Sequence, residues 1–484
     1  MIDTKALRSR VLDLAIQGKL TEQLESDGTA EELWQQIQAE KQRLIKEGKL
    51  KKEKPLPEIS EEEIPFEIPG NWKWVRLSEI CQQITDGTHR TPSYQSEGIP
   101  FLSVKNISSG FIDYSDIKYI SASEHSELIK RCKPEKNDIL ICRIGTLGKA
   151  IVIESEKEFS IFVSLGLIKT GSELLSQYIV RSINSGYGVQ WIKAHKAGNS
   201  MHADKINLTD LCLMTIPLPP LAEQKRIVAR VEEIFRLLDI IDAAQEQYAA
   251  DAESLKAKLI TLGIQGRLTE QLANDGTAEE LYQQIQAEKQ RLIKEGKIKR
   301  EKPLPEISED EIPFEIPENW KWVRLGNIVT VLGGKRIPAG RSLTTDDTGH
   351  KYIRVSDMKN LSVDTSNLLY VPEDIYPSIS RYIINKEDVY ITVAGTIGRV
   401  GTIPDEIDGA NLTENADRLV FSDLDKYWLV YCLYSNAVQK QIEFLTTQVA
   451  QPKLAIKRIQ EFCIPLPPLA EQKRIVETLE RVLG

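Results

Sequence analysis

The thirteen residues IPLPPLAEQKRIV occupy positions 216–228 and recur unchanged at 464–476, a shift of 248 positions. A longer segment, residues 16–77, recurs at 264–325 with the same shift, and 54 of its 62 positions are identical. Between these repeated segments lie two stretches of roughly 135 residues each, which have diverged almost completely. The chain is therefore an internal duplication in which a constant frame carries two different inserts. Such an arrangement suits a molecule that reads two unlike half-targets at a set separation.

The segment after Pro219 and Pro220 predicts a long helix over residues 221–262. Apolar side chains recur there at alternating spacings of four and three, with Gln245 as the one polar residue of the stripe. Five such heptads indicate a coiled-coil seam, which places residues such as Leu238 and Leu255 at buried positions.

A second copy of this helix is divided between the two chain ends. Residues 469–484 match its first part, and residues 1–17 match its last part with Leu7, Val11 and Leu14 on the seam. We therefore expect an intact helix to pack antiparallel against a split one, with the termini close together and the two halves related by an approximate twofold axis.

A second helix of the frame is expected from Thr29, which forms a capping box with Glu32, to just before Gly48. Its copy runs from Thr277 to Gly296. Its apolar face is expected to dock on the long helices or on a partner protein; the face consists of Leu33, Ile37, Leu44 and Ile45. The charged, proline-containing residues 51–69 predict an extended connector into the insert.

Each insert opens with the strand sequence NWKWVRL and then departs from its counterpart. The patterns predict mixed α/β (α+β) domains, in which strands and helices are interspersed. In the first insert we expect strands at 100–104, 138–143, 149–153 and 160–168 and helices near 173–184 and 188–196. In the second we expect strands at 351–355, 388–393, 399–403 and 416–421 and a helix at 426–444. The expected domain limits are 1–17, 18–70, 71–218, 219–262, 263–318, 319–466 and 467–484.

The charge is distributed unevenly. The net charge of the chain is -9, whereas residues 71–215 carry 17 Lys+Arg against 15 Asp+Glu and residues 319–463 carry 17 against 17. The remainder therefore carries -9 - 2 - 0 = -11. Because phosphate neutralisation drives nonspecific affinity, a neutral insert alone should bind DNA weakly and would need a basic partner.

The sequence shows neither a signal peptide nor a membrane span, so a soluble intracellular protein is expected. Its cysteines lack close CxxC pairing, and packed thiols are favoured over disulfides or zinc ligands. The six are Cys81, Cys132, Cys142, Cys212, Cys432 and Cys463.

The repeated IPLPPLAEQKRIV, the paired variable inserts and the long helices make the whole chain similar to the specificity subunits of type I restriction-modification systems. The resemblance implies that each insert is a target recognition domain for one half of a bipartite double-stranded DNA site, and that the helices set the spacer. It further implies assembly with two adenine methyltransferase subunits and with endonuclease/translocase subunits, in the cytoplasm of a prokaryote. S-adenosylmethionine, ATP and Mg²⁺ would then belong to the partner subunits, with no cofactor and no metal on this chain.

Candidate DNA contacts lie at matching places, near the start and the end of each insert, where donors are combined with small residues. In the first insert they are Thr88, His89, Arg90, Thr91, Lys193, His195, Lys196, Asn199, His202 and Lys205. In the second they are Lys335, Arg336, Arg341, Gln448, Gln451 and Lys453. For any one of them, a solvated surface position is as well supported as a contact.

Other features have simpler interpretations. Arg143 and Lys149 flank GTLG and Arg399 follows GTIG, where a hairpin turn is favoured over a phosphate contact. The tryptophans of the repeated strand, Trp72, Trp74, Trp320 and Trp322, are expected to pack rather than to stack on bases. His195 and His202 have no third ligand nearby in the sequence, so a metal site is not favoured.

No GxxxxGK[ST] phosphate loop and no [DN]PP[FYW] methyltransferase tetrapeptide occurs in the chain. This pattern favours a subunit that recognises DNA without catalysing a reaction. Two alternatives remain open at this point: an enzyme with an unrecognised catalytic centre, and a scaffold whose two inserts bind proteins.

Overall fold

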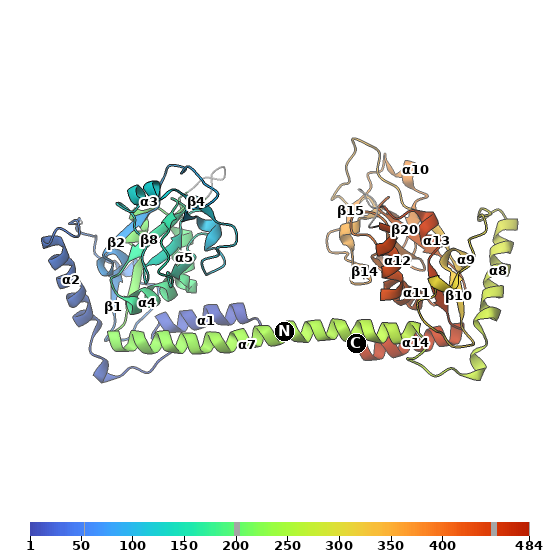
Figure 1. Ribbon diagram of the computed structural model, residues 1–484, viewed down its shortest axis with the longest axis horizontal. Helices are drawn as coiled ribbons and strands as arrows, with labels where there is room; N and C mark the ends of the chain where they lie inside the picture. Colours follow the sequence, from blue (N-terminus) through green and yellow to red (C-terminus); the bar gives the residue numbers. More distant parts are fainter. Residues whose placement is uncertain (53, 198–203, 447–452, 484) are drawn as a thin grey trace. The chain divides into compact units, whose positions relative to one another are not determined.

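The computed structural model describes residues 1–52, 54–197, 204–446 and 453–483. The chain forms two compact units, Met1–Gln247 and Tyr248–Gly484 (Figure 1). Each unit contains one copy of the frame and one insert. The long helix α7 (Leu221–Ile264) contributes its first part to unit 1 and its last part to unit 2.

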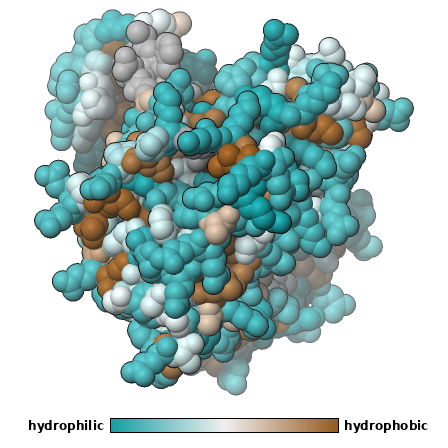
Figure 2. All heavy atoms as spheres, turned by 90° about the vertical axis from the view of Figure 1, so that its left-hand side faces the viewer, coloured by the Kyte–Doolittle hydropathy of each residue, from teal (hydrophilic) through white to brown (hydrophobic). Residues whose placement is uncertain are grey.

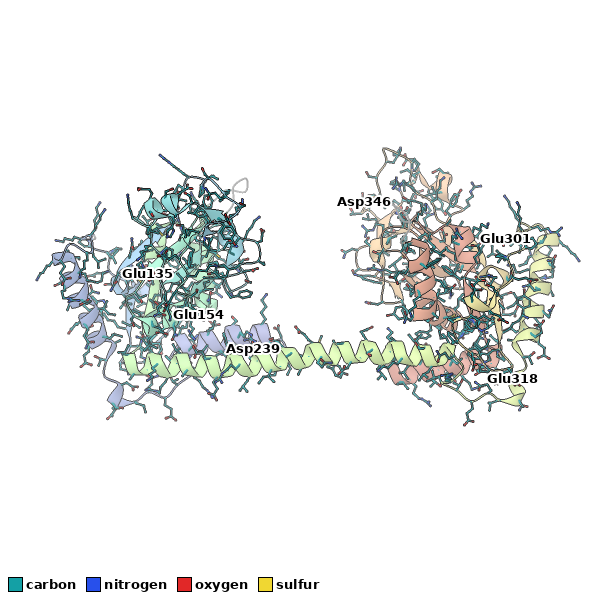
Figure 3. All side chains as sticks on the ribbon, in the orientation of Figure 1. Glu135, Glu154, Asp239, Glu301, Glu318 and Asp346 are labelled. Carbon is teal, nitrogen blue, oxygen red and sulfur yellow. The ribbon has the colours of Figure 1, made fainter. Side chains whose placement is uncertain are left out.

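In unit 1, helix α1 (Thr4–Ile16) lies antiparallel to the first part of α7 (Figure 1). Near the start of α1, the backbone N–H of Ile2 donates to the side chain of Gln245. Arg8 donates to Asp239 at 2.7 Å, and Figure 3 shows Asp239 on α7 beside α1. Farther along α1, Leu12 is buried in the same core as Val231. The predicted antiparallel pairing of these two segments is confirmed.

In unit 2, helix α14 (Leu469–Leu483) packs on the last part of α7. Ile260 and Ile264 share a core with Ile475 and Leu479. Each end of α7 is therefore paired with a separate chain end, as the split repeat predicted. The predicted closeness of the two termini, which belong to different units, stays a prediction.

The predicted seam is only partly right. Leu238 is 5% exposed, but Leu255 is 51% exposed. Leu7, the counterpart of Leu255 in the other copy, is also exposed. In α1 the buried apolar positions are Leu12, Ala15 and Ile16, and not the predicted Leu7, Val11 and Leu14. Because each short helix also packs against its insert, the buried stripe rotates away from a pure heptad seam.

The described residues of the insert of unit 1 form three sheets. Its first and last strands form an antiparallel pair, β1 with β9, so the insert closes on the frame at one place. A four-stranded sheet has the order β2-β8-β5-β6, and a three-stranded sheet has the order β4-β3-β7. The strands are β1 (Lys73–Arg76), β2 (Gln83–Asp86), β3 (Ile99–Leu102), β4 (Lys118–Ile120), β5 (Ile139–Cys142), β6 (Ala150–Val152), β7 (Ser160–Ile161), β8 (Leu165–Lys169) and β9 (Thr215–Leu218). The helices are α3 (Ala122–Leu128), α4 (Glu173–Asn184), α5 (Gly186–Ala194) and α6 (Leu208–Cys212).

The insert of unit 2 repeats this plan. Strand β10 pairs with β21, and the main sheet has the order β11-β20-β17-β18. A second sheet has the order β15-β12-β19-β16, and β13 pairs with β14. The strands are β10 (Lys321–Arg324), β11 (Thr330–Gly333), β12 (Lys351–Ile353), β13 (Met358–Lys359), β14 (Ser362–Val363), β15 (Leu369–Tyr370), β16 (Ile383–Ile384), β17 (Val389–Thr392), β18 (Val400–Thr402), β19 (Ala410–Leu412), β20 (Ala416–Val420) and β21 (Cys463–Leu466). The helices are α9 (Leu325–Ile328), α10 (Tyr376–Ile379), α11 (Lys426–Tyr434), α12 (Asn436–Thr446) and α13 (Ile456–Gln460).

The mixed α/β class is confirmed, but two predicted elements are wrong. The strand expected at 160–168 is two strands, β7 and β8, which belong to different sheets. The helix expected at 426–444 is two helices, because Ser435 adopts an extended conformation with ψ 151°. The Ser435 hydroxyl donates to the carbonyl of Cys432 at 2.6 Å and so stabilises the break.

The second helix of the frame is α2 (Ala30–Lys46), with its copy α8 (Ala278–Lys294). The predicted capping box is present, since Thr29 accepts from the N–H of Glu32 and Glu32 accepts from the N–H of Thr29. Helix α2 docks on the insert of its own unit, where Lys41 donates to the carbonyl of Ser78 at 2.6 Å. Leu33 and Ile37 of the predicted apolar face pack on a core that contains both insert residues and residues of α7, as expected for docking on the long helix. Docking of this face on a partner protein stays a prediction.

The connector after α2 is clamped by Arg76, a buried residue of β1. Its guanidinium donates to both carboxylate oxygens of Glu63 and to the carbonyls of Glu58 and Leu213. Hydrogen bonding from Arg76 lowers the pKa of Glu63 to about 2. Arg324 makes the equivalent bonds in unit 2.

A buried carboxylate joins a frame helix to the insert in each unit, from α7 in unit 1 and from α14 in unit 2. Glu223 of α7 accepts from the indole N–H of Trp72 at 2.7 Å and from Thr21 and Gln23 of the repeated segment. Glu471 does the same with Trp320, Thr269 and Gln271. The frame residues therefore hold two different inserts by identical contacts.

The surface of unit 1 that carries α2 is largely hydrophilic, with small hydrophobic patches (Figure 2). No cysteine of the chain, all six of which are described, forms a disulfide, and five of them are buried, so the prediction of packed thiols is confirmed. Among the described residues, no helix has the length and apolar character needed to cross a membrane.

Candidate nucleic-acid interface

A loop leaves the same edge of the main sheet in both units. Gly87 follows β2, and a Cβ atom there would lie 2.0 Å from the carbonyl oxygen of Ile161. Gly334 follows β11, and a Cβ atom there would lie 2.0 Å from the carbonyl oxygen of Thr413. Glycine is therefore required at both positions by close approach of the backbone. Although the inserts have diverged, both have a glycine where the loop with predicted contact residues leaves the edge strand.

The carboxylate of Asp86 organises the loop of unit 1. Arg143 donates to Asp86 Oδ2, Arg131 donates to Oδ1 at 2.9 Å, and His89 Nε2 lies 3.1 Å from Oδ2. Burial alone would raise the pKa of Asp86, but the charge of Arg143 and the bond from Arg131 hold the pKa below its ordinary value. Arg131 also donates to the carbonyl of Gly87 at 2.6 Å, which fixes the start of the loop.

Arg143 connects this loop to the other predicted segment of the first insert. Its Nε donates to the carbonyl of Ile206 at 3.2 Å, and the N–H of Ile206 donates to the carbonyl of Arg143 at 3.0 Å. Lys205 and Ile206 therefore lie beside the hairpin turn after β5, where Lys205 also bridges to Ile144. Arg143 is buried and structural, as the hairpin interpretation favoured, and it brings the two predicted contact segments together.

The predicted residues of unit 1 differ in how available they are. Arg90, Thr91 and Lys193 are exposed, and within the described residues Arg90 and Lys193 form no ion pair. Thr88 is half-buried and accepts from the backbone N–H of Arg90 at 3.2 Å. Other predicted residues already have partners: His195 stacks on Trp191 at 3.9 Å, and Lys196 pairs with Asp204 at 2.6 Å. Asn199 and His202 lie outside the described residues.

Four predicted residues of unit 2 are described, and all four are exposed: Lys335, Arg336 and Arg341 after β11, and Lys453 before α13. Lys335 lies 5.8 Å from the ring centre of Tyr382. Arg336 pairs with Glu414 at 2.6 Å, and Arg341 pairs with Asp374. Lys453 is exposed, and the next residue donates from its N–H to the carbonyl of Val393 at 2.9 Å. Gln448 and Gln451 lie outside the described residues.

A second buried carboxylate, Asp417 of β20, lies beneath the loop of unit 2. Within the described residues, its Oδ2 has no hydrogen-bond partner. Burial raises the pKa of Asp417 to about 6, although the positive charge of Lys453 acts in the opposite direction. The two units thus place one buried acid at corresponding edges, with arginine partners only in unit 1.

Both units therefore combine an exposed loop that follows a glycine with a later segment beside the central hairpin. Exposed Arg and Lys side chains on such loops can contact phosphates, and their neighbours can reach base edges. The sequence-based prediction missed the organising role of Asp86 and Arg131, because 45 positions separate them. The sequence offered no local signal for this pair.

The comparisons with known proteins agree with this arrangement. The profile described as "Type I restriction modification DNA specificity domain" matches residues 69–247 and 317–484. The chain belongs to this family of type I restriction-modification DNA specificity proteins, and its two insert domains are the target recognition domains.

Two relatives match this chain over most of their length. The chain is 28% identical to the type I restriction enzyme EcoAI specificity subunit of Escherichia coli, over 99% of this chain and 89% of the relative. It is also 28% identical to the EcoEI specificity subunit of Escherichia coli, over 98% and 88%. A solved structure described as showing complex assembly and conformational transition of the type I R-M system superposes with a TM-score of 0.56 at 19% identity. The superposition covers 86% of this chain and 91% of the other, and it supports the fold.

Proposed function

We propose that each target recognition domain reads one half of a bipartite, asymmetric double-stranded DNA site through the loop after β2 or β11 and the later segment beside the hairpin. The observation that supports the proposal is the pair of glycines Gly87 and Gly334. At each of them, a loop of different sequence leaves the main sheet from the corresponding position. The constant frame holds each loop pair in a fixed setting, while the divergent residues supply the contacts.

The frame also docks two methyltransferase subunits, which modify adenine, and endonuclease/translocase subunits join this assembly. The local charge supports this division of labour. The inserts are close to neutral, and several predicted cations are already paired with acids, so the chain alone offers few free charges to phosphates. A basic partner that encloses the duplex supplies the missing affinity. S-adenosylmethionine, ATP and Mg²⁺ act on those partners, in the cytoplasm of a prokaryotic cell, and this chain itself is not catalytic.

The test is a map of methylated adenines in cells that express the chain with its methyltransferase partner, beside cells that lack either one. The expected result is one split, asymmetric sequence that is methylated only when both are present. Methylation by the purified chain alone would support the enzyme alternative instead.

An exchange of one insert separates DNA reading from protein scaffolding. Replacing residues 78–214 by the corresponding insert of a relative should change one half of the methylated sequence and leave the other half and the spacing unchanged. The matched control replaces residues 326–462, which should change the opposite half. An unchanged methylated sequence in both exchanges would favour the scaffold alternative.

A further inference from the structure

One pair of corresponding positions in the two inserts carries very different side chains. Helix α5 begins after Ser185 and α12 begins after Ser435, and each serine hydroxyl donates to the carbonyl three residues earlier, at 2.7 and 2.6 Å. Counting two residues from each serine places Tyr187 in unit 1 and Ala437 in unit 2 at corresponding positions. A large aromatic side chain in one half is therefore replaced by a methyl group in the other.

In unit 1, Tyr187 completes an aromatic cluster at the foot of the insert. Its ring lies edge-on to Phe66 at 5.6 Å and to Trp74 at 6.0 Å. Its hydroxyl donates to the carbonyl of Thr215 at 3.0 Å. The ring is thus held by two residues of the repeated frame and by the last strand of the insert.

In unit 2 the frame keeps its half of this cluster. Phe314 and Trp322 lie 5.0 Å apart at 57°, against 5.1 Å and 58° for Phe66 and Trp74. With alanine at position 437, a groove of about 800 Å³ opens there. Its apolar lining includes Ile264, Phe314, Ala437, Phe444, Leu445 and Phe462.

The polar end of the Tyr187 site is already satisfied in unit 2. Gln441 accepts from the N–H of Cys463 at 2.9 Å and donates to its carbonyl at 2.9 Å. Cys463 is the counterpart of Thr215, whose carbonyl receives the tyrosine hydroxyl in unit 1. What unit 2 lacks is therefore the apolar ring, and the groove should favour an aromatic group whether or not it carries a hydroxyl.

Charge around the groove favours a polypeptide over a nucleic acid. The wall contains three acids and three bases, so a polyanion gains no net attraction there; they are Asp310, Glu311, Glu461, Arg324, Lys440 and Arg458. The volume is within the range of about 300–1,000 Å³ that holds a ligand larger than a single ring. A short peptide segment with one aromatic anchor and flanks of both charges fits these walls.

We propose that this groove is a docking site for a segment of a partner protein that inserts a phenylalanine or tyrosine side chain beside Phe314 and Ala437. Tyr187 fills the corresponding place in unit 1, so the partner binds one half of the duplicated frame and leaves the other half unbound. The proposal goes beyond DNA reading, because it gives two nearly identical frames different binding properties. It does not depend on which DNA sequence the inserts read.

The test uses the full-length chain and a blocked five-residue peptide with a central 4-fluorophenylalanine between glycine and serine residues. Fluorine NMR should show one binding site per chain, and the same peptide with central leucine should compete at least roughly tenfold more weakly. Ala437→Tyr and Ala437→Phe should each abolish binding, because the new ring occupies the groove. Tyr187→Ala should add a second site, because it opens the matched place in unit 1.

Further measurements distinguish a partner peptide from a small ligand, duplex DNA or a second copy of the chain. A blocked fluorophenylalanine amide that binds as well as the peptide would point to a small ligand and overturn the proposal, as would displacement of the peptide by duplex DNA. Self-association that Ala437→Tyr abolishes would identify a second copy as the occupant and also overturn it. Thermal unfolding monitors the integrity of each variant, and Ala437→Phe provides a second filled groove if Ala437→Tyr fails to fold. Peptide binding that survives in a folded Ala437 variant would place the site elsewhere.

Discussion

Asp417 of β20 lies directly opposite Gly333 of β11, at the rung of the main sheet where unit 1 has Gly166 opposite Asp86. The duplicated fold has thus kept a buried carboxylate at one place while moving it to the neighbouring strand. In unit 1 two arginines bind the carboxylate, whereas in unit 2 the burial of Asp417 is not matched by a comparable partner among the described residues.

We expect Asp417→Asn to stabilise unit 2 at neutral pH. The pKa of Asp417 is raised from 3.8 to about 6, so the folded state disfavours the charged form. Ionisation of Asp417 therefore reduces the free energy of unfolding. This loss is absent below the unfolded pKa of 3.8, grows as the pH rises from 3.8 to about 6, and reaches roughly 3 kcal/mol above about 6. Thermal unfolding at pH 8 and at pH 4 should show a gain at pH 8 that disappears at pH 4.

Asp86→Asn is the matched comparison, and it should have the opposite effect. The pKa of Asp86 is lowered, so its ionised form stabilises the fold above the unfolded pKa, and this contribution is lost as the pH falls through the folded pKa. Removing the charge leaves Arg143 buried beside a neutral group, at a cost of about 3 kcal/mol at pH 7. Equal effects of the two substitutions would contradict the environments described for these two carboxylates.

Arg90→Ala and Lys193→Ala should weaken DNA binding by the assembled methyltransferase complex, because both side chains are exposed and free of ion pairs within the described residues. If each contacts a phosphate, the slope of log affinity against log salt should fall by about one for each substitution. Binding to a cognate duplex over a series of salt concentrations measures this slope. Lys49→Ala, at a residue just after α2 that is paired with Glu47, should leave the slope unchanged.

Arg76→Ala should loosen the connector and destabilise unit 1 by about 3 kcal/mol, since it removes a buried cation and leaves carbonyls without donors. Arg324→Ala should do the same in unit 2. The clamp should also weaken in acid. The pKa of Glu63 is lowered from 4.5 to about 2, so the ionised carboxylate stabilises the fold above about pH 4.5, and this contribution is lost as the pH falls towards about 2. Proteolysis of residues 51–69 at pH 7 and chemical denaturation measure the two effects; resistance equal to that of the unmodified chain would contradict the clamp.

Leu238→Asp should cost about 3 kcal/mol or more, because this side chain is only 5% exposed and the substitution would bury a charge. Leu255→Asp should change the stability by less than about 1 kcal/mol, because this side chain is 51% exposed. Denaturant unfolding of both variants separates the two expectations. A large loss for Leu255→Asp would restore the uniform heptad seam that the sequence alone suggested.

The sequence predicted the frame more accurately than the inserts, for identifiable physical reasons. The limits of α2 were predictable because Thr29 and Glu32 form a local cap and Gly48 adopts a positive φ, so only nearby residues decide them. The pairing of β1 with β9 was not predicted, because its partners are separated by more than a hundred positions. Likewise, the single helix expected at 426–444 ignored Ser435, whose hydroxyl favours a break that its apolar neighbours do not reveal.

The candidate site shows the same limit. The exposed loops could be located from glycines and donors, and their equivalence in the two inserts is supported by Gly87 and Gly334. The buried carboxylate beneath each loop could not be located from the sequence. Asp86 and Asp417 are on different strands in the two copies, so no alignment of the inserts brings them together. Which exposed cations are free also depends on acids distant in sequence, such as Glu414 for Arg336.

The contacts of Glu223 and Glu471 have a consequence for how such proteins diversify. Every group that these carboxylates bind, including Trp72 and Trp320, belongs to the duplicated sequence. Recombination with crossovers inside the repeats would therefore introduce a foreign insert into a protein that already contains every residue needed for these contacts. New binding preferences could then arise in a single recombination event, without a period of compensating mutations in the rest of the polypeptide.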